Sequence, residues 1–188
     1  MRRVTFDIET TGGGNIIDPR TMELSVVGIH DTETDAFSTF TKEELPELWK
    51  IFEKADVLVG YNSDHFDIPI LNKYYAGDLS KIRSIDLLAE IKNVLGRRLK
   101  LDSVAEATLG RKKTGSGLDA VKWWAEGEYE KVKHYCIEDV RITKDVYEYA
   151  LKNGKIFYSD FGQKRAIPLD TSRWESGEGA SLTHTLPF

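Results

Sequence analysis

Cysteine is almost absent from this sequence, since Cys136 is the only one among 188 residues. A single cysteine excludes an intramolecular disulfide framework and a zinc cluster built from several thiolates. Any metal site in this chain is therefore expected to use oxygen or imidazole ligands.

Long hydrophobic runs are also missing, because no apolar stretch approaches the ~20 residues of a membrane-spanning helix. The chain passes from Met1 directly into a strand-like segment, without the apolar core and small-residue cleavage site of a signal peptide. With 40% hydrophobic and 30% charged residues, the composition is that of a soluble globular protein. We therefore expect a cytoplasmic protein with no membrane partner.

An excess of positive charge is absent as well, since the formal net charge is -5 at pH 7. This balance disfavours a protein that coats long stretches of nucleic-acid backbone, but it is compatible with one that grips a chain end. The basic residues of one region form a cluster: Arg97, Arg98, Lys100, Arg111, Lys112 and Lys113. Such a cluster is either a solvated face or a phosphate-binding one, and the sequence leaves both interpretations open.

The order of strand and helix signals predicts the fold class. Three segments rich in β-branched and aromatic residues come first, at 3–9, 23–30 and 34–40. Helical patterns follow at 42–55, 67–77, 87–96, 101–110, 118–127 and 128–154, with strand patterns between them at 56–62 and 81–86. An antiparallel meander followed by βα units indicates an α/β protein with a mixed five-stranded central sheet flanked by helices.

The last part of the chain predicts a hairpin and a tail. Residues 155–169 have the pattern of a β-hairpin with its turn at Phe161 and Gly162. Beyond the hairpin the chain is rich in Ser, Gly and Thr, which is typical of a flexible segment. We therefore expect one domain over residues 1–168 and a flexible or partner-binding tail over 169–188. Its short apolar end suits docking on a replication or repair protein.

Two acidic residues interrupt the first apolar strand, VTFDIET. Successive side chains of a strand point to opposite faces, so Asp7 and Glu9 share one face. Two like charges this close are unfavourable unless a proton or a cation relieves the repulsion. The pair indicates either a divalent-cation site or the solvated face of an edge strand.

Two further acids occur within apolar patterns. Asp67 follows a short buried strand and starts an apolar helix, which suits a helix cap as well as a metal ligand. Asp139 lies in the inward stripe of the last helix, which comprises Val132, Cys136, Thr143, Val146 and Ala150. An inward-facing acid needs a partner, and no basic residue lies in this stripe. Two Mg²⁺ or Mn²⁺ ions shared with Asp7, Glu9 and Asp67 would provide one.

Three segments, FDIET, YNSDHFD and HYCIED, together resemble the exonuclease motifs of the DEDD superfamily of 3′-to-5′ exonucleases, which have the RNase H-like fold. GYN…FDIPIL and YC..DV are similar to the exonuclease domain of family B DNA polymerases and its stand-alone bacterial relatives. The resemblance covers residues 3 to about 150. It implies that two divalent cations are bound by Asp7, Glu9, Asp67 and Asp139.

The resemblance also implies a residue that orients the attacking water, either Tyr in Y-x-x-x-D or His in H-x-x-x-x-D. This sequence satisfies both patterns with Tyr135 and His134. A helical side chain four positions before Asp139 lies ~40° around the axis from it, whereas one five positions before lies ~140° away. No helix breaker follows Gly127, so we expect an unbroken helix with Tyr135 toward the acids and His134 at the surface.

Five residues beside the motifs are candidates for binding the substrate: Thr10, Thr11, Gly12, Asn62 and Phe66. The first three follow the acidic strand in a loop that permits close backbone approach, although such glycines also occur in ordinary hairpin turns. Asn62 either holds a phosphate or closes a turn. Asp86 is expected to cap the helix over 87–96.

The acids and this resemblance together predict a two-metal 3′-to-5′ exonuclease that releases nucleoside 5′-monophosphates from single-stranded 3′ ends, with DNA favoured as substrate. A 3′-to-5′ exoribonuclease uses the same chemistry, and the sequence does not separate the two because 2′-hydroxyl contacts depend on pocket shape. A third hypothesis is a proofreading or accessory module that acts through a polymerase, helicase or clamp.

Overall fold

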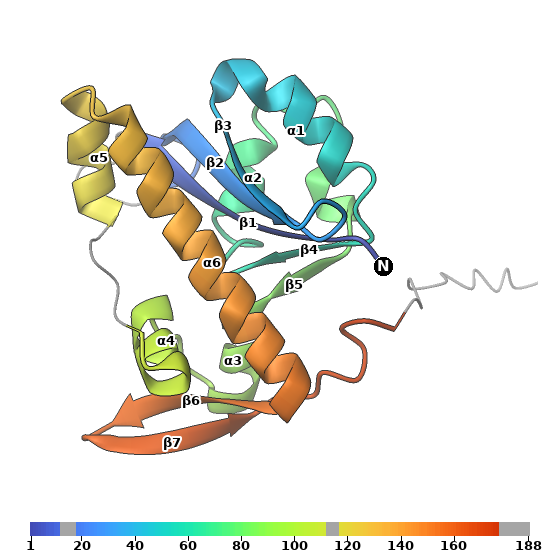
Figure 1. Cartoon of the computed structure of the whole chain (residues 1–188), viewed down its shortest axis with the longest axis vertical. Coiled ribbons are helices and arrows are strands. Elements are labelled where there is room, and N and C mark those ends of the chain that lie inside the picture. Colours follow the sequence, from blue (N-terminus) through green and yellow to red (C-terminus); the bar gives the residue numbers. More distant parts are fainter. Residues whose placement is uncertain (12–17, 112–116, 177–188) are drawn as a thin grey trace, which may run out of the picture.

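The computed structural model describes residues 1–11, 18–111 and 117–176. Its main sheet contains β1 (Arg3–Thr11), β2 (Glu23–Asp31), β3 (Ala36–Phe40), β4 (Val57–Gly60) and β5 (Ser84–Asp86). The strand order is β3-β2-β1-β4-β5, with antiparallel pairing from β3 to β1 and parallel pairing from β1 to β5. The predicted α/β class and mixed five-stranded sheet are confirmed (Figure 1).

The helices cover both faces of this sheet. They are α1 (Leu45–Phe52), α2 (Asp67–Leu71), α3 (Leu87–Leu95), α4 (Leu101–Leu109), α5 (Gly117–Ala125) and α6 (Tyr129–Asn153), with 3-10 turns at Lys42–Glu44 and Leu79–Lys81. Within the described ranges, none of these helices is both long and apolar enough to span a membrane.

Apolar clusters on the two faces bury the central strand. On one face, Val4, Phe6 and Ile8 of β1 pack with α1 and α2. On the other face α6 crosses the sheet, and its C-terminal half packs with β4, β5, α3 and α4 (Figure 1). The N-terminal half of α6 packs with α5 and with Val26 of β2. β1 therefore lies between two apolar layers, and polar groups on it are largely shielded from water.

The second helix is shorter than the predicted range 67–77, because α2 ends at Leu71. The side-chain oxygen of Asn72 accepts a hydrogen bond from the backbone N–H of Leu79 (2.9 Å), which stabilises a turn instead of further helix. The chain consequently turns back toward β5 after a single buried turn of helix.

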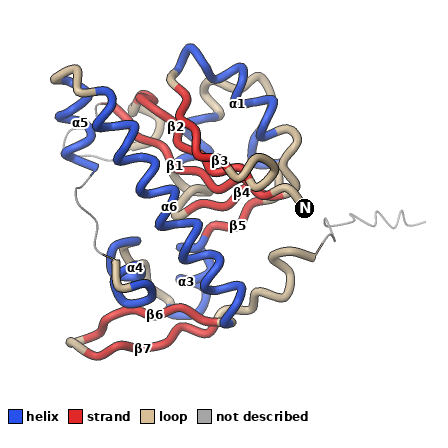
Figure 2. Tube along the Cα trace, in the orientation of Figure 1, coloured by secondary structure: helices blue, strands red, loops and turns tan. Residues whose placement is uncertain are grey.

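The predicted C-terminal hairpin is formed by β6 (Lys155–Asp160) and β7 (Gln163–Pro168), with Phe161 and Gly162 in the turn. It is a separate two-stranded sheet below α4 in Figure 2. Its inner side chains, Ile156, Tyr158 and Ile167, join the cluster beneath α4 and α6, so the hairpin is anchored to the domain.

Residues 169–176 pack on the domain, so the expected tail does not begin at residue 169. Trp174 is buried and stacks on Tyr147 of α6, with ring centroids 5.0 Å apart. Arg83 donates a hydrogen bond to the carbonyl oxygen of Trp174 (3.2 Å). Burial of one large aromatic side chain outweighs the polar composition that suggested a tail. The remainder of the expected tail, 177–188, lies outside the described residues.

Candidate active site

Asp7 and Glu9 lie on the face of β1 that α6 covers, opposite the side chains that pack on α1 and α2. Asp7 is half-buried and Glu9 is 7% exposed. β1 pairs with β4 only over Arg3–Thr5, whereas its pairing with β2 continues to Thr11. The acids therefore lie on a firmly held strand whose edge is open on the β4 side.

Asp67 reaches this open edge from the start of α2. Its Oδ1 accepts a hydrogen bond from the backbone N–H of Ile8 (3.2 Å), the residue between Asp7 and Glu9. Asp67 is 4% exposed, and burial raises the pKa of its carboxyl group to about 8, against the lowering effect of backbone hydrogen bonds. Ionising this group in the fold is costly, and a bound divalent cation would offset the cost.

Asp139 approaches from α6, where it is 5% exposed within the predicted inward stripe. One turn earlier, the thiol of Cys136 donates a hydrogen bond to the carbonyl oxygen of Asp7 (3.4 Å), and its Sγ lies 4.0 Å from Asp7 Oδ2. Burial raises the pKa of this thiol, and the negative charges of Asp7, Glu9 and Asp139 raise it further. The three carboxylates are therefore close enough to the thiol to disfavour its ionisation.

The geometry of this cluster fits a metal centre. One ligand atom from each of Asp7, Glu9 and Cys136 lies within 4.8 Å of the others. Carboxylate oxygens are the ligands that Mg²⁺ and Mn²⁺ prefer. The Cys136 thiol has a raised pKa, so it is protonated at neutral pH and acts as a hydrogen-bond donor rather than as a thiolate ligand.

Sequence reasoning missed that Cys136 lies within the acidic cluster. The available signal was its place in the inward stripe, three residues before Asp139. That spacing puts the two side chains on one helix face, although it does not reveal which strand they meet.

Gly28, also missed, permits the close approach of α6 to the sheet. It lies on β2 directly opposite Asp7. A Cβ atom at Gly28 would be 2.9 Å from Sγ of Cys136 and 3.1 Å from Cγ2 of Val140. Any side chain there would push α6, and Asp139 with it, away from β1. The one sequence cue is a glycine inside the apolar strand LSVVGIH.

Tyr135 and His134 have the helical phase that the sequence predicts. α6 begins at Tyr129 and runs unbroken past both residues. Tyr135 is buried on the same face as Asp139, whereas His134 is exposed. The Tyr135 ring packs edge-on against Trp123, with centroids 6.1 Å apart. The geometry that a histidine role requires, a helix starting near residue 135, is not observed.

Thr10 and Thr11 end β1, and Thr11 lines a cavity of about 590 Å³, whereas Thr10 is buried and is not part of its lining. The pairing register shifts between Glu9 and Thr10, so that Ser25 of β2 is the extra residue of a β-bulge. Thr11, Ser25 and Trp124 are among the residues that line this cavity. Its size and its mixture of aromatic and polar walls suit a small ligand. Gly12 lies outside the described residues.

Asn62 closes a turn, with φ at +67°, and its side-chain oxygen accepts a hydrogen bond from Arg98. Its backbone N–H donates to Asp86 Oδ1 (2.7 Å). Asp86 also caps α3 as predicted, accepting from the backbone N–H of Leu88 (2.9 Å). Phe66 is half-buried and packs against the cluster around α1 and α2. The loop before Asp67 is therefore fixed at several points.

Stability of the cation-free protein is expected to fall as pH rises from about 5 to 8. The pKa of Asp67 is about 8 in the fold against an ordinary 3.8, so the folded state binds more protons between these values than the unfolded state does. Urea unfolding in a chelator, at several pH values, measures the effect. Asp67→Asn should make the free energy of unfolding less dependent on pH, whereas Glu43→Gln, at an exposed acid, should not. Equal slopes for wild type and Asp67→Asn would contradict the expectation.

The fold and the acidic cluster together define an α/β protein with a candidate divalent-cation centre on its central strand. The chain belongs to the RNase H superfamily, whose family model matches residues 4–151. Membership of this superfamily and the cluster of carboxylates favour a nuclease, and hence nucleic acid as the substrate.

Among solved structures, the chain is similar to the family B DNA polymerase from the hyperthermophilic archaeon Pyrobaculum calidifontis, with a TM-score of 0.61 and 23% sequence identity. The match covers 80% of this chain and 24% of the polymerase chain, so this chain spans about a quarter of that protein. At 23% identity, the similarity shows that the two proteins share a fold. A search of curated protein sequences gives no match.

Proposed function

We propose that this protein is a metal-dependent 3′-to-5′ exonuclease that removes nucleotides from the 3′ end of single-stranded nucleic acid, with DNA as the favoured substrate. One observation carries the proposal: three separate elements bring buried or half-buried carboxylates to one part of β1. Asp7 and Glu9 lie on this strand, and Asp67 of α2 accepts a hydrogen bond from the N–H of Ile8. Asp139 is buried on α6, one turn after Cys136, whose thiol binds the Asp7 carbonyl. The residues proposed to hold two Mg²⁺ or Mn²⁺ ions are Asp7, Glu9, Asp67 and Asp139. Like charges at this density are unfavourable unless a proton or a cation relieves the repulsion, and divalent cations would relieve it with all four carboxylates ionised.

The reaction in this proposal is hydrolysis of the terminal phosphodiester bond. Bound divalent cations would supply an activated water and neutralise charge on the leaving oxygen. The water oxygen bonds to phosphorus, the bond from phosphorus to the 3′ oxygen of the preceding nucleotide breaks, and that oxygen leaves with a proton. A nucleoside 5′-monophosphate is released. β1 and α6 contribute rigid positions for the carboxylates, because both elements are packed on the core.

The terminal nucleotide is assigned in this proposal to the cavity at the end of β1. Thr11 lines the cavity and would donate a hydrogen bond to the nucleotide, and Trp124 offers an apolar wall. Thr10, the preceding residue, is proposed to contact the nucleotide through its backbone. Asn62 and Phe66, in the loop before Asp67, would contact the sugar or phosphate on the other side of the acids. Support for this assignment comes from Thr11, which lines the cavity and lies two residues after Glu9 on the same strand.

Tyr135 is proposed to orient the attacking water through its hydroxyl group. Tyr135→Phe is therefore expected to lower kcat by about 10²-fold, with little change in KM, because the ring is kept and only the hydroxyl is lost. His134→Ala, on the exposed face of the same turn, is the matched control and should retain full activity. Steady-state kinetics on a labelled single strand measure both. If His134→Ala were inactive and Tyr135→Phe fully active, the water-orienting role would belong to His134 instead of Tyr135.

The proposal is tested by a time course on single strands of one sequence, as DNA and as RNA, each carrying a 5′ fluorophore, with Mg²⁺ or Mn²⁺. The expected result is a ladder that shortens from the 3′ end, with nucleoside 5′-monophosphates identified by mass spectrometry. The relative rates of hydrolysis of the DNA and RNA strands decide between an exodeoxyribonuclease and an exoribonuclease. Internal cuts, shortening from the 5′ end, or no hydrolysis of either strand with either ion would reject it.

A further inference from the structure

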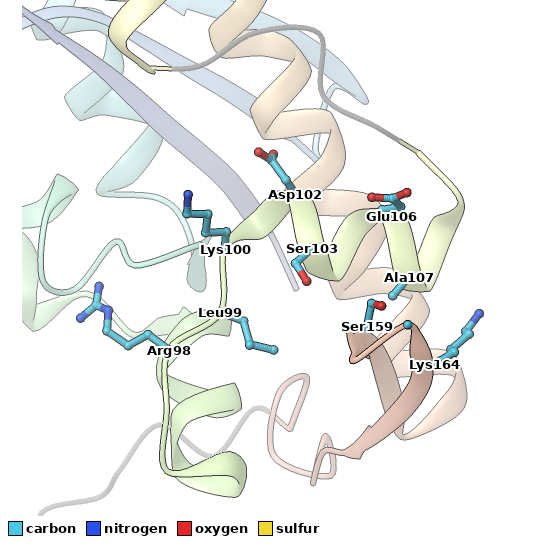
Figure 3. A pocket seen from close by; sticks show the side chains of 10 residues that line it. Arg98, Leu99, Lys100, Asp102, Ser103, Glu106, Ala107, Ser159 and Lys164 are labelled. Carbon is cyan, nitrogen blue, oxygen red and sulfur yellow. The ribbon is translucent and has the colours of Figure 1, made fainter.

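A groove of about 620 Å³ lies outside the acidic site, between α4 and the β6–β7 hairpin. We call it the hairpin groove. Its lining includes Arg98, Leu99 and Lys100 from the loop before α4, Ser103 from α4, and Ser159 and Lys164 from the hairpin. Figure 3 shows these side chains arranged around the opening between the two elements.

The walls of the hairpin groove are held together by polar contacts. Thr108 of α4 accepts a hydrogen bond from the backbone N–H of Phe157 (2.9 Å) and donates one to its carbonyl oxygen (3.1 Å). Arg97 forms an ion pair with Asp160 (3.1 Å), which joins the loop to the hairpin. The groove is therefore a fixed feature of the fold, and binding in it requires little ordering of the chain.

Three cations of the groove are available to an anionic ligand. Arg98, Lys100 and Lys164 are exposed, and among the residues that the structure describes none of them has an acidic partner. Arg98 donates to the neutral amide of Asn62, and Lys164 lies 4.4 Å from the centre of the Phe157 ring. Both contacts leave the positive charge uncompensated.

Two acids also line the groove, Asp102 and Glu106, and each has interactions of its own. In Figure 3 their carboxylates point to the upper side of α4, whereas Ser103 points down toward the hairpin. Figure 3 shows Lys100 pointing up as well, and Arg98 and Lys164 pointing outward on the two sides of the opening. The groove therefore presents serine hydroxyl groups inside and the three cations at its rim, and both suit phosphate groups.

Phe161 adds an aromatic surface at the tip of the hairpin. It is 100% exposed and adopts a left-handed conformation, with φ at +48°. Hairpin turns favour Asn or Gly in that conformation, so phenylalanine is a costly choice for the fold alone. Its neighbour Gly162 and Lys164 of the same hairpin line the groove. Exposed aromatic rings and cations together are the combination with which proteins bind single-stranded nucleic acid, by stacking on bases.

The hairpin groove adjoins the loop that leads to the acidic site. Arg98 contacts Asn62, and the hydroxyl of Tyr61 donates to the carbonyl oxygen of Leu99 (2.9 Å). Asn62 lies five residues before Asp67. In Figure 1 the hairpin turn and the carboxyl ends of β1 and β4 point to the same side of the molecule. The loop before Asp67 thus connects the acidic site with the wall of the groove.

We propose that the hairpin groove binds a single nucleic-acid strand on the 5′ side of the bond that the acidic site hydrolyses. Its phosphates contact Arg98, Lys100 and Lys164, and one of its bases stacks on Phe161. The direction along the strand rests on the proposed exonuclease function, whereas binding itself does not.

The test is binding of fluorescein-labelled oligonucleotides of about 20 thymidines or uridines, measured by anisotropy in a chelator. Arg98→Ala/Lys100→Ala/Lys164→Ala should weaken binding at least about tenfold and lower the salt dependence of log Kd by about 2, at ~0.7 per phosphate contact. Lys50→Ala/Lys54→Ala/Lys81→Ala removes the same charge from exposed sites elsewhere and should bind nearly as wild type does. Equal weakening in both triple variants would overturn the proposal.

Phe161→Asn separates binding from folding. Asn suits the turn, so the thermal unfolding midpoint should stay or rise. Binding should weaken by about fivefold or more, because a stacked base is lost. If the affinity were unchanged, Phe161 would not contribute to binding of the strand.

The two proposals fail in different ways. If wild type hydrolyses strands but the groove variants match the control in binding and in KM, only the groove is rejected. If binding depends on the groove but no hydrolysis occurs with Mg²⁺ or Mn²⁺, only the exonuclease is rejected. If wild type neither binds nor hydrolyses single strands, both are rejected.

Discussion

Replacing Asp7 or Asp139 with asparagine is expected to reduce hydrolysis at least about 10³-fold while the protein stays folded. Asparagine keeps the size of the side chain but loses the charge that a divalent cation needs. Removing one of several neighbouring negative charges relieves repulsion in the cation-free protein, so the unfolding midpoint in a chelator should stay or rise. Initial rates on a labelled strand and thermal unfolding with and without Mn²⁺ measure both effects.

Glu138→Gln is the matched control for these variants. Glu138 precedes Asp139 on α6, is half-exposed, and forms an ion pair with Arg141 (3.2 Å). It should retain activity and the stabilisation by Mn²⁺, both of which Asp7→Asn and Asp139→Asn should lose. If the Asp139→Asn enzyme kept wild-type activity, the acidic cluster would not be the catalytic centre.

Gly28→Ala is expected to lower both stability and activity, although glycine has no side chain that could bind a metal or the substrate. The new Cβ would lie 2.9 Å from Sγ of Cys136, whose position is fixed by its hydrogen bond to Asp7. Relief requires α6 to move, which should cost about 1–3 kcal/mol of stability. A shift of about 1 Å in Asp139 relative to Asp7 is sufficient for about a 10²-fold loss of activity. Urea unfolding and initial rates measure the two effects.

A second substitution tests whether the contact with α6 is the cause. Gly28→Ala combined with Cys136→Ala removes the colliding sulfur, and it should recover part of the stability and activity that Gly28→Ala loses. Gly117→Ala serves as control, because a Cβ there meets nothing within 4 Å. Additive effects in the double variant, with no recovery, would show that α6 is not held in place through this contact.

Local periodicity was sufficient for most of the fold and for part of the site. Alternation along β1 put Asp7 and Glu9 on one face, and the helical repeat put Tyr135 and Asp139 on one buried face of α6. These are properties of short segments, in which geometry fixes the direction of each side chain. The same reasoning predicted a second helix that is too long. It does not account for the hydrogen bond between the Asn72 side chain and the backbone N–H of Leu79, which is not part of the helical repeat.

Contacts between distant segments were beyond such reasoning. The bond from Asp67 to the N–H of Ile8 spans 59 positions, and the one from Cys136 to Asp7 spans 129. Residues 169–176 had the composition of a tail, yet Trp174 stacks on Tyr147. Polar composition predicts solvent exposure only when no apolar partner is available, and the presence of such a partner is decided elsewhere in the chain.

The sequence by itself determined the fold class, the order of its elements and the acids that point inward, because these follow from periodicity and from the cost of burying charge. Only the tertiary structure decided how the acids meet. α6 approaches β1 closely because Gly28 leaves room for Cys136, and the β4 side of β1 is open beyond Thr5, where Asp67 enters. Packing of that kind depends on the shapes of two surfaces at once, and no single segment encodes it.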